Sequence, residues 1–249
     1  MIMEYTSLKL TRVTDLLPAL AGIVEEMQAF RDGKYLAGLW EDTLASDLCW
    51  STWDYYAHNI AETAQRLSHR GTISSAWRAP TWSWASTEAI IEYSDVTNLK
   101  EQAKVLEVEC LPQNPGFSFG LAWGCVVALG QMSAARIEYI KRPMPPRGDV
   151  TLVYDLELQG ARGKGSYYYF LPDYDFRMAH ESDGVGPGAI VYCLKMGITS
   201  TRVYTLVLRC VDETDQMFKR VGLVTQQINV EGFVDWYDGS SEESVVRIC

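Results

Sequence analysis

The chain has 249 residues, of which 47% are hydrophobic and 22% are charged, and its formal net charge is −10. This is the composition of an ordinary globular protein, long enough to bury a sizeable core as one large domain or two small ones. The acidic balance argues against nonspecific binding to nucleic acid or to anionic lipid, because both need a surplus of Lys and Arg on the surface.

The first residues, MIMEYTSLKLTRVTD, reach Glu4 at once and contain no apolar segment of the kind that a secretory signal needs. Six cysteines are present, and no two of them are close enough for a CxxC metal-binding pair. In a chain without a secretory signal we expect these cysteines to be reduced and mostly buried. The same reasoning predicts a cytoplasmic protein. The six positions are Cys49, Cys110, Cys125, Cys193, Cys210 and Cys249.

The N-terminal part of the chain predicts helices. Two segments follow the first predicted helix, which is described below. Residues 37–50, AGLWEDTLASDLCW, predict a second helix, and the polar residues 54–69 form either a third helix or a surface excursion. The first helix is predicted after an N-cap at Thr14 or Asp15, with Pro18 in its first turn. Its apolar residues recur at helical spacing, namely Leu16, Leu20, Ile23, Val24 and Met27.

Beyond Pro80 the apolar period changes from about 3.6 to 2, which predicts strands. KVLEVEC, residues 104–110, places Leu106, Val108 and Cys110 on one face. Two hairpins are predicted, one from TLVYDLEL and SYYYFL around GARGKG, and one from YTLVLRCV and MFKRVGLV around DETDQ. SVVRIC predicts a closing strand.

One uncharged stretch, residues 110–135, includes the largely apolar run FSFGLAWGCVVALG. A membrane-spanning helix needs roughly 20 predominantly apolar residues. Prolines, amides and glycines interrupt this run, so a buried strand or hairpin explains it better than a membrane span.

The pattern of elements predicts an α+β fold that is mostly β. We expect a helical N-terminal part, residues 1–70, packed on an antiparallel β-sandwich or barrel-like body, residues 71–249, as one integrated unit.

Candidate catalytic and phosphate-binding patterns are weak. His58, His69 and His180 are scattered and form neither HExxH nor an i, i+4 pair, and no GxSxG motif occurs. GARGKG, residues 160–165, fails the spacing of a phosphate loop, and strand-like sequence follows it where such a loop needs a helix. A hairpin turn is therefore the favoured interpretation.

The acidic residues do not form a specific site pattern either. Asp173, Asp175 and Asp183 begin like a calcium loop, but the remaining ligands are missing, and a solvated acidic loop is favoured. We therefore predict no catalytic residues, no cofactor and no metal, and we do not expect an enzyme.

The stretch RAPTWSWAS, residues 78–86, places Trp82 and Trp84 two residues apart, just after Pro80. On a strand, side chains at i and i+2 share a face, so the two indoles would point the same way. An outward face would make them a platform for a ligand, and an inward face would place them in the core. We favour the core, because exposed paired tryptophans are costly unless a ligand or partner covers them.

Three segments resemble the region that follows the HET domain in fungal heterokaryon-incompatibility proteins. LTRVTDLLPALAGIVEEMQ is similar to the family's LT…D.LPALSGIA helix, KYLAGLWEDTLASDLCW to its YLAGLW…L…LLW segment, and RAPTWSWAS to its APSWSWAS. Their order and spacing also agree, and YTLVLRCVDETDQMFKRVGLV resembles the closing LVLR…YERVG pair. We expect the signature positions to be structural, and these are Tyr35, Gly38, Leu39, Trp40, Trp50, Pro80, Trp82, Trp84 and Ser86.

The family's N-terminal signatures, an SYxWG-like strand and a W.D..CI.Q-like segment, do not occur here. The chain therefore resembles a C-terminal portion of such a protein, a truncated gene product or a diverged stand-alone relative. The resemblance implies a non-enzymatic accessory region that binds a protein partner in fungal non-self recognition, where the HET domain is thought to trigger incompatibility cell death. The alternative is a carbohydrate-binding β domain or glycosidase-like enzyme, since eight Trp, fourteen Tyr and 32 acidic residues are available.

Overall fold

The structure is a computed structural model, and it describes residues 1–8, 10–52, 77–93, 96, 98–113, 122–144, 149–158, 168–176, 184–229, 233, 235–237 and 241–249. The helix or surface excursion predicted at residues 54–69, the three histidines and the GARGKG stretch lie outside these described residues.

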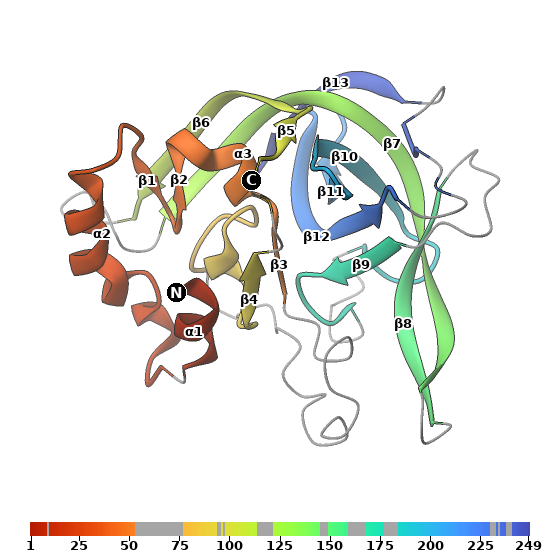
Figure 1. The fold of residues 1–249 in the computed structure, drawn as a ribbon, viewed down its shortest axis with the longest axis horizontal. Helices are drawn as coiled ribbons and strands as arrows, with labels where there is room; N and C mark the ends of the chain where they lie inside the picture. Colours follow the sequence, from red (N-terminus) through yellow and green to blue (C-terminus); the bar gives the residue numbers. More distant parts are fainter. Residues whose placement is uncertain are drawn as a thin grey trace.

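Strands make up most of the described chain, with short helices near the N-terminus (Figure 1). The helical elements are α1 Ile2–Ser7, η1 Val13–Asp15, η2 Pro18–Leu20, α2 Ala21–Gln28, η3 Glu41–Thr43, α3 Leu44–Asp47 and η5 Trp84–Ser86. The strands are β1 Tyr35–Leu36, β2 Leu39–Trp40, β3 Trp50–Thr52, β4 Ile91–Tyr93, β5 Lys100–Glu101, β6 Lys104–Pro112, β7 Ala122–Met144, β8 Asp149–Leu158, β9 Tyr168–Pro172, β10 Ile190–Ile198, β11 Arg202–Asp212, β12 Met217–Gln227 and β13 Glu242–Ile248.

Strands β7, β10, β11, β12 and β13 close into a ring (Figure 1). Met132 of β7 pairs with Leu194 of β10 and with Glu242 of β13, so these two strands lie on opposite edges of β7. From β10 the pairing continues through β11 and β12 and returns to β13. Closing a sheet on itself removes open edges. The predicted α+β, mostly β fold with a barrel-like body is confirmed.

The two faces of the ring contribute to two hydrophobic cores. On β10, Val191 and Cys193 belong to one core, whereas Leu194 and Met196 belong to the other. Side chains alternate along a strand, so these two cores lie on opposite faces of the barrel wall. The core that contains Leu194 also contains Trp50 and other residues of the N-terminal part. We call it the outer core, because it packs against the N-terminal part, and we call the core that contains Val191 the inner core.

Helix α2 confirms the C-terminal half of the first predicted helix, while the residues before it form the 3-10 turns η1 and η2. Pro18 is the first residue of η2, as the tolerance of proline in a first turn predicts. Leu20 and Val24 are buried, but Ile23 is exposed, so the buried face is narrower than expected. Helix α1 was not predicted. It is held to the next segment by the Tyr5 hydroxyl, which donates to the carbonyl of Leu16 at 2.6 Å.

The helix predicted over residues 37–50 is wrong for most of its length. Ala37 and Gly38 have φ values of 47° and 104°, and they form the two-residue turn of a hairpin between β1 and β2. The carboxylate of Asp47 accepts a hydrogen bond from the backbone N–H of Trp40 at 2.9 Å and holds this hairpin against the following turn. Only the four residues of α3 are α-helical.

Strand positions were predicted better than strand partners. β11 and β12 form the antiparallel hairpin predicted around DETDQ, and β13 is the predicted closing strand. The turn of the other predicted hairpin lies outside the described residues, and within them β8 pairs with β7 and β9 pairs with β12. Apolar alternation identifies a strand, but tertiary packing chooses its neighbour.

Strand β6 keeps Val108 and Cys110 on the predicted buried face, but Leu106 departs from it. Its register with β7 shifts between Val105 and Glu107, and such a β-bulge changes which face the following side chains occupy. As a result Leu106 is exposed, whereas Val105 and Val108 are half-buried against the outer core.

The uncharged stretch supplies the beginning of β7, where Val126 and Ala128 are fully buried in the outer core. This confirms the strand interpretation for its described residues. No helix within the described ranges has the length and apolarity to span a bilayer.

The expectation that all cysteines are reduced is wrong for Cys125 and Cys249, which form a disulfide with their Cα atoms 4.3 Å apart. They are separated by 124 residues and meet because β13 pairs with the start of β7. Burial raises the pKa of Cys49 and Cys193 to about 12, so neither of these two free thiols is a thiolate near neutral pH.

Candidate functional site

The stretch RAPTWSWAS is not a strand. The carbonyl of Pro80 accepts from the backbone N–H of Ser83 at 3.0 Å, which closes a turn, and the 3-10 helix η5 follows. The hydroxyl of Ser83 accepts from the N–H of Ala85 at 3.0 Å and caps η5, while the hydroxyl of Ser86 donates to the carbonyl of Ser83 at 2.7 Å. These local side-chain hydrogen bonds favour a turn over a strand, because Ser satisfies nearby backbone groups that a sheet would otherwise pair.

Trp82 and Trp84 are both 0% exposed, so the core interpretation of this pair is confirmed. Their indoles reach different elements instead of sharing one strand face. The Nε1–H of Trp82 donates to the carbonyl of Gly124 on β7 at 3.1 Å, and that of Trp84 donates to the carbonyl of Gly38 at 2.8 Å. The Nε1–H of Trp50 donates to the carbonyl of Trp82 at 2.9 Å. Each ring therefore buries a large apolar surface with its polar atom satisfied.

Gly38 shows why the hairpin and the tryptophan turn need each other. A Cβ atom at this position would lie 2.7 Å from Nε1 of Trp84, closer than real Cβ contacts. The φ of Gly38 is also positive, which favours glycine. The hydroxyl of Ser83 adds a short hydrogen bond to the carbonyl of Ala37. The backbone of the β1–β2 turn at Gly38 therefore packs directly against the indole ring of Trp84 in η5.

The other signature positions lie around the same contact. Leu39 and Trp40 are buried in the outer core. Tyr35 packs edge-on against Trp40, with ring centroids 5.3 Å apart, and burial raises the pKa of its hydroxyl. The structure therefore brings together residues of the KYLAGLW and PTWSWAS segments, and the bonded residues Gly38 and Trp84 are 46 positions apart in the chain.

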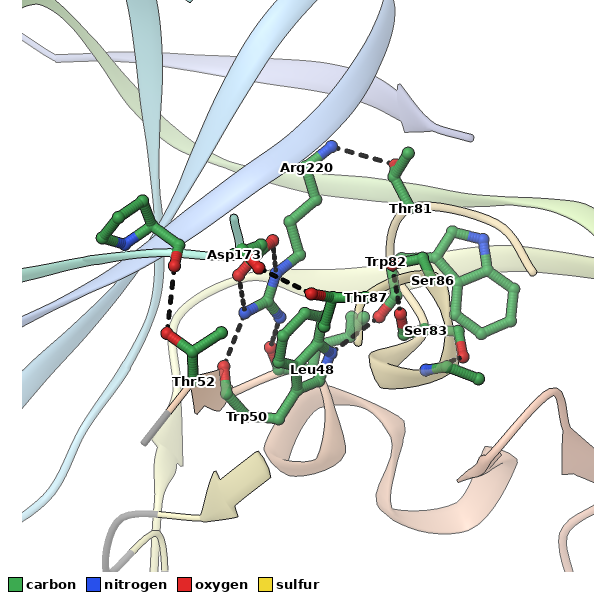
Figure 2. Close-up of polar contacts among 12 residues, drawn as sticks. Leu48, Trp50, Thr52, Thr81, Trp82, Ser83, Ser86, Thr87, Asp173 and Arg220 are labelled. Carbon is green, nitrogen blue, oxygen red and sulfur yellow. Dashed lines mark hydrogen bonds and ion pairs between the residues drawn. The ribbon is translucent and has the colours of Figure 1, made fainter. Parts of the chain in front are cut away.

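Arg220 of β12 lies beside this cluster and connects β12 to three other segments of the chain (Figure 2). Its Nε and Nη2 atoms donate to both carboxylate oxygens of Asp173 at 2.9 and 3.1 Å. Nη1 donates to the carbonyl of Leu48 and Nη2 to that of Trp50, each at 2.5 Å. The backbone N–H of Arg220 donates to the hydroxyl of Thr81 at 3.0 Å.

This ion pair is enclosed by further contacts. The guanidinium carbon of Arg220 lies 3.5 Å from the ring centroid of Trp50, a cation–π contact. The hydroxyl of Thr87 donates to the carbonyl of Asp173 at 2.8 Å, and the hydroxyl of Thr81 donates to the carbonyl of Cys249. Burial raises the pKa of the Asp173 carboxyl, and the Arg220 guanidinium opposes that shift. All three guanidinium nitrogens donate hydrogen bonds within the protein. The Arg220–Asp173 pair, which we call the ionic centre, therefore holds elements of the fold together.

The acidic loop was predicted wrongly at the two described aspartates. Asp173 and Asp175 are buried instead of solvated, the first against Arg220 and the second accepting a hydrogen bond from the hydroxyl of Tyr154. Within the described ranges, no three His, Cys, Asp or Glu side chains gather in a way that would hold a metal ion. Sequence reasoning missed Arg220 altogether, because an arginine within an apolar strand carries no local signal of its partner 47 residues away.

A second polar cluster lies beside the inner core. Lys195 lies on the same face of β10 as Cys193, and its Nζ donates to the carboxylate of Asp235 at 3.0 Å. The ammonium also lies 5.1 Å from the ring centroid of Tyr237, whose hydroxyl donates to that of Thr205 at 3.0 Å. These contacts tie the segment 235–237 to the barrel wall.

A third feature is exposed. The rings of Trp77 and Trp123 are stacked, with centroids 4.2 Å apart and planes inclined by 10°, and the residues are 38% and 49% exposed. Leu111 of β6 is the cross-strand neighbour of Trp123, and Glu109 and Glu107 follow on the same outward face of β6. We call these five exposed residues the aromatic face.

The buried and exposed tryptophans predict opposite effects on stability. Trp84→Ala should lower the free energy of unfolding by about 3–5 kcal/mol, because it leaves a cavity in the outer core. Trp123→Ala, the matched control, should lower it by about 1 kcal/mol or less, since only an exposed stacking contact is lost. Urea unfolding of both variants measures the difference. Equal losses would contradict the assignment of Trp84 to the core.

Removing one partner of the enclosed ion pair should be costly. Asp173→Ala leaves the Arg220 guanidinium buried without its carboxylate and should lower the free energy of unfolding by about 3–5 kcal/mol. Asp42→Ala breaks the partly exposed pair with Arg31 and should cost less than about 1 kcal/mol. Thermal and urea unfolding provide the comparison, and a loss at Asp173 no larger than that at Asp42 would show that the centre is dispensable.

Comparisons of the chain with family models, with curated proteins and with solved structures find no match. The resemblance to HET-type proteins therefore rests on the motifs quoted from the sequence.

Proposed function

We propose that this chain is a non-catalytic recognition module, the accessory region of a fungal HET-type protein that acts in non-self recognition. In this proposal the motif residues build the scaffold, and a protein partner binds to the aromatic face. The burial of Trp82 and Trp84 and the enclosed Arg220–Asp173 pair support the scaffold role, because neither leaves a reactive group open to a substrate.

The exposed stack of Trp77 and Trp123 is the observation that carries the proposal. Large exposed apolar groups gathered on one face mark interaction sites, and tryptophan is enriched among the residues that dominate binding energy. The stack is also held in place, because the Nε1–H of Trp77 donates to the carbonyl of Ala122 at 3.1 Å. An anchored aromatic pair loses little conformational freedom when a partner covers it.

The charges beside the stack favour a cationic partner. Glu107 and Glu109 lie on the same face as Leu111, and the whole chain carries a net charge of −10. Arg247 of β13 lies across β7 from Glu107, so the acidic character is strongest at the Glu109 end, next to Trp123. An Arg or Lys side chain bound there gains both a carboxylate and the face of an indole ring. We therefore propose a partner segment in which a basic residue neighbours an apolar one.

The carbohydrate-binding alternative also finds its support in this face. Sugar rings stack on exposed aromatic side chains, and Trp77 and Trp123 supply such a surface, whereas Trp82 and Trp84 are buried and do not. The two functions differ in what the carboxylates contribute. Binding of a cationic peptide depends on the charge of Glu109, whereas binding of a neutral glycan depends on stacking against the rings and not on that charge.

Binding of short probes separates the two functions. We expect a peptide that alternates arginine and leucine to change the tryptophan fluorescence of the wild-type chain, and its glutamate–leucine counterpart to have no effect. The response should disappear in the Trp77→Ala, Trp123→Ala double variant and weaken at least severalfold in Glu109→Gln. Phe30→Ala removes an 89% exposed apolar residue outside the aromatic face and serves as the control. A response to a neutral oligosaccharide, and none to the cationic peptide, would favour the carbohydrate-binding function.

Expression in a fungal host tests the accessory role. The 249-residue chain alone should leave the cells viable, because the resemblance assigns the death signal to the HET domain, whose signatures it lacks. The same chain fused behind a HET domain should permit incompatibility, and colony viability measures both. Cell death caused by the chain alone would contradict an accessory role.

A further inference from the structure

Arg78, the first residue of the RAPTWSWAS stretch, carries a buried guanidinium without a matching acceptor. The residue is 4% exposed. Its nearest charged partner is Glu88, with Oε1 3.6 Å from Nη1, which is too long for a hydrogen bond. Its Nε and Nη2 atoms are also shielded from solvent and find no hydrogen-bond partner among the described residues.

The contrast with Arg220 shows how unusual this is. Both arginines are buried, yet all three guanidinium nitrogens of Arg220 donate to carboxylate or carbonyl oxygens. A buried donor without an acceptor costs free energy, and more so when the group is charged. Burial also lowers the pKa of Arg78, which reflects the same loss of solvation. The sequence nevertheless places an arginine here, where an apolar residue would avoid this cost.

The two unpaired nitrogens have a specific geometry. Nε–H and one N–H of Nη2 lie on the same edge of the planar guanidinium and point in parallel, which matches the two oxygens of a carboxylate or phosphate. The backbone of Arg78 is fixed, because its carbonyl accepts from the N–H of Ala122 at the start of β7, at 3.3 Å. Trp77 is anchored to the carbonyl of the same Ala122. The edge is thus presented by a held segment of chain.

We propose that the Nε/Nη2 edge of Arg78 is a binding site for an oxyanion, a carboxylate or a phosphate group. The anion accepts both hydrogen bonds and supplies the charge that Glu88 provides only at a distance. The two nitrogens are shielded from solvent, so binding of the anion requires the side chains around them to move. This inference does not depend on the partner proposed for the aromatic face, since that surface is outward and attracts cations.

Thermal unfolding with inorganic phosphate and with acetate, at constant ionic strength set by chloride, tests the site. We expect the melting temperature of the wild-type chain to rise in a saturable way, by about 4 °C at a tenfold excess over Kd. Arg78→Met should lose this rise because it has no donors, and Arg78→Lys should lose most of it because an ammonium lacks the paired edge. Arg31→Gln, which changes an arginine in a partly exposed ion pair, should respond like the wild-type chain.

Phosphate also stabilises proteins in general by exclusion from their surface, so a linear rise shared by all four chains does not count as binding. A response to phosphate but not acetate assigns a phosphate group, and an equal response to both assigns an oxyanion of either kind. Identical curves for the wild-type chain and Arg78→Met would overturn the proposal.

If the Arg78 variants do not fold, the wild-type chain still provides a test by nuclear magnetic resonance. Titration with phosphate should shift a slowly exchanging arginine Nε–H resonance with the same midpoint as the melting curve. The absence of any such shift would equally overturn the site.

Discussion

The bidentate pair between Arg220 and Asp173 is the interaction on which the rest of the structure depends. The guanidinium of Arg220 donates to the backbone carbonyls of Leu48 and Trp50 in the N-terminal part, and Asp173, which supplies the carboxylate, directly follows β9. The N–H of Arg220 reaches the tryptophan turn through Thr81. A charge buried this deeply requires a partner and filled hydrogen bonds. The positions of several separate segments are therefore fixed by the need to supply hydrogen-bond acceptors to the guanidinium of Arg220.

This centre also decides where function can lie. The signature tryptophans surround it, and their indole N–H groups donate to backbone carbonyls, so that cluster supports the fold and offers no open face. Recognition then falls to groups that the fold holds in place but leaves incomplete. The aromatic face exposes apolar and acidic groups outward, and Arg78 presents two donors inward. Both are anchored through Ala122, where β7 begins.

Apolar periodicity predicted the mostly β class, the position of β11, β12 and β13, and most of α2, since these patterns are local properties of a chain. It failed where local turn and capping hydrogen bonds, or the choice of strand partners, overruled the apolar spacing. WSWAS alternates like a strand, yet Ser83 and Ser86 turn it into a capped 3-10 helix. The segment 37–50 has helical spacing, yet Ala37 and Gly38 reverse the chain after two residues. β8 and β9 were predicted as strands, but the pairing of β8 with β7 and of β9 with β12 carried no local signal.

By itself, the sequence determined the fold class, the core role of Trp82 and Trp84 and the motifs that resemble HET-type proteins, because composition, spacing and side-chain size are written along the chain. Only the tertiary structure decided that Cys125 meets Cys249, that Asp173 meets Arg220, and that Arg78 is buried without an acceptor. These relations join residues far apart in the chain, or record a contact that is missing. Whether a charge is paired, shielded or exposed depends on which elements pack around it, and no local pattern of residues carries that information.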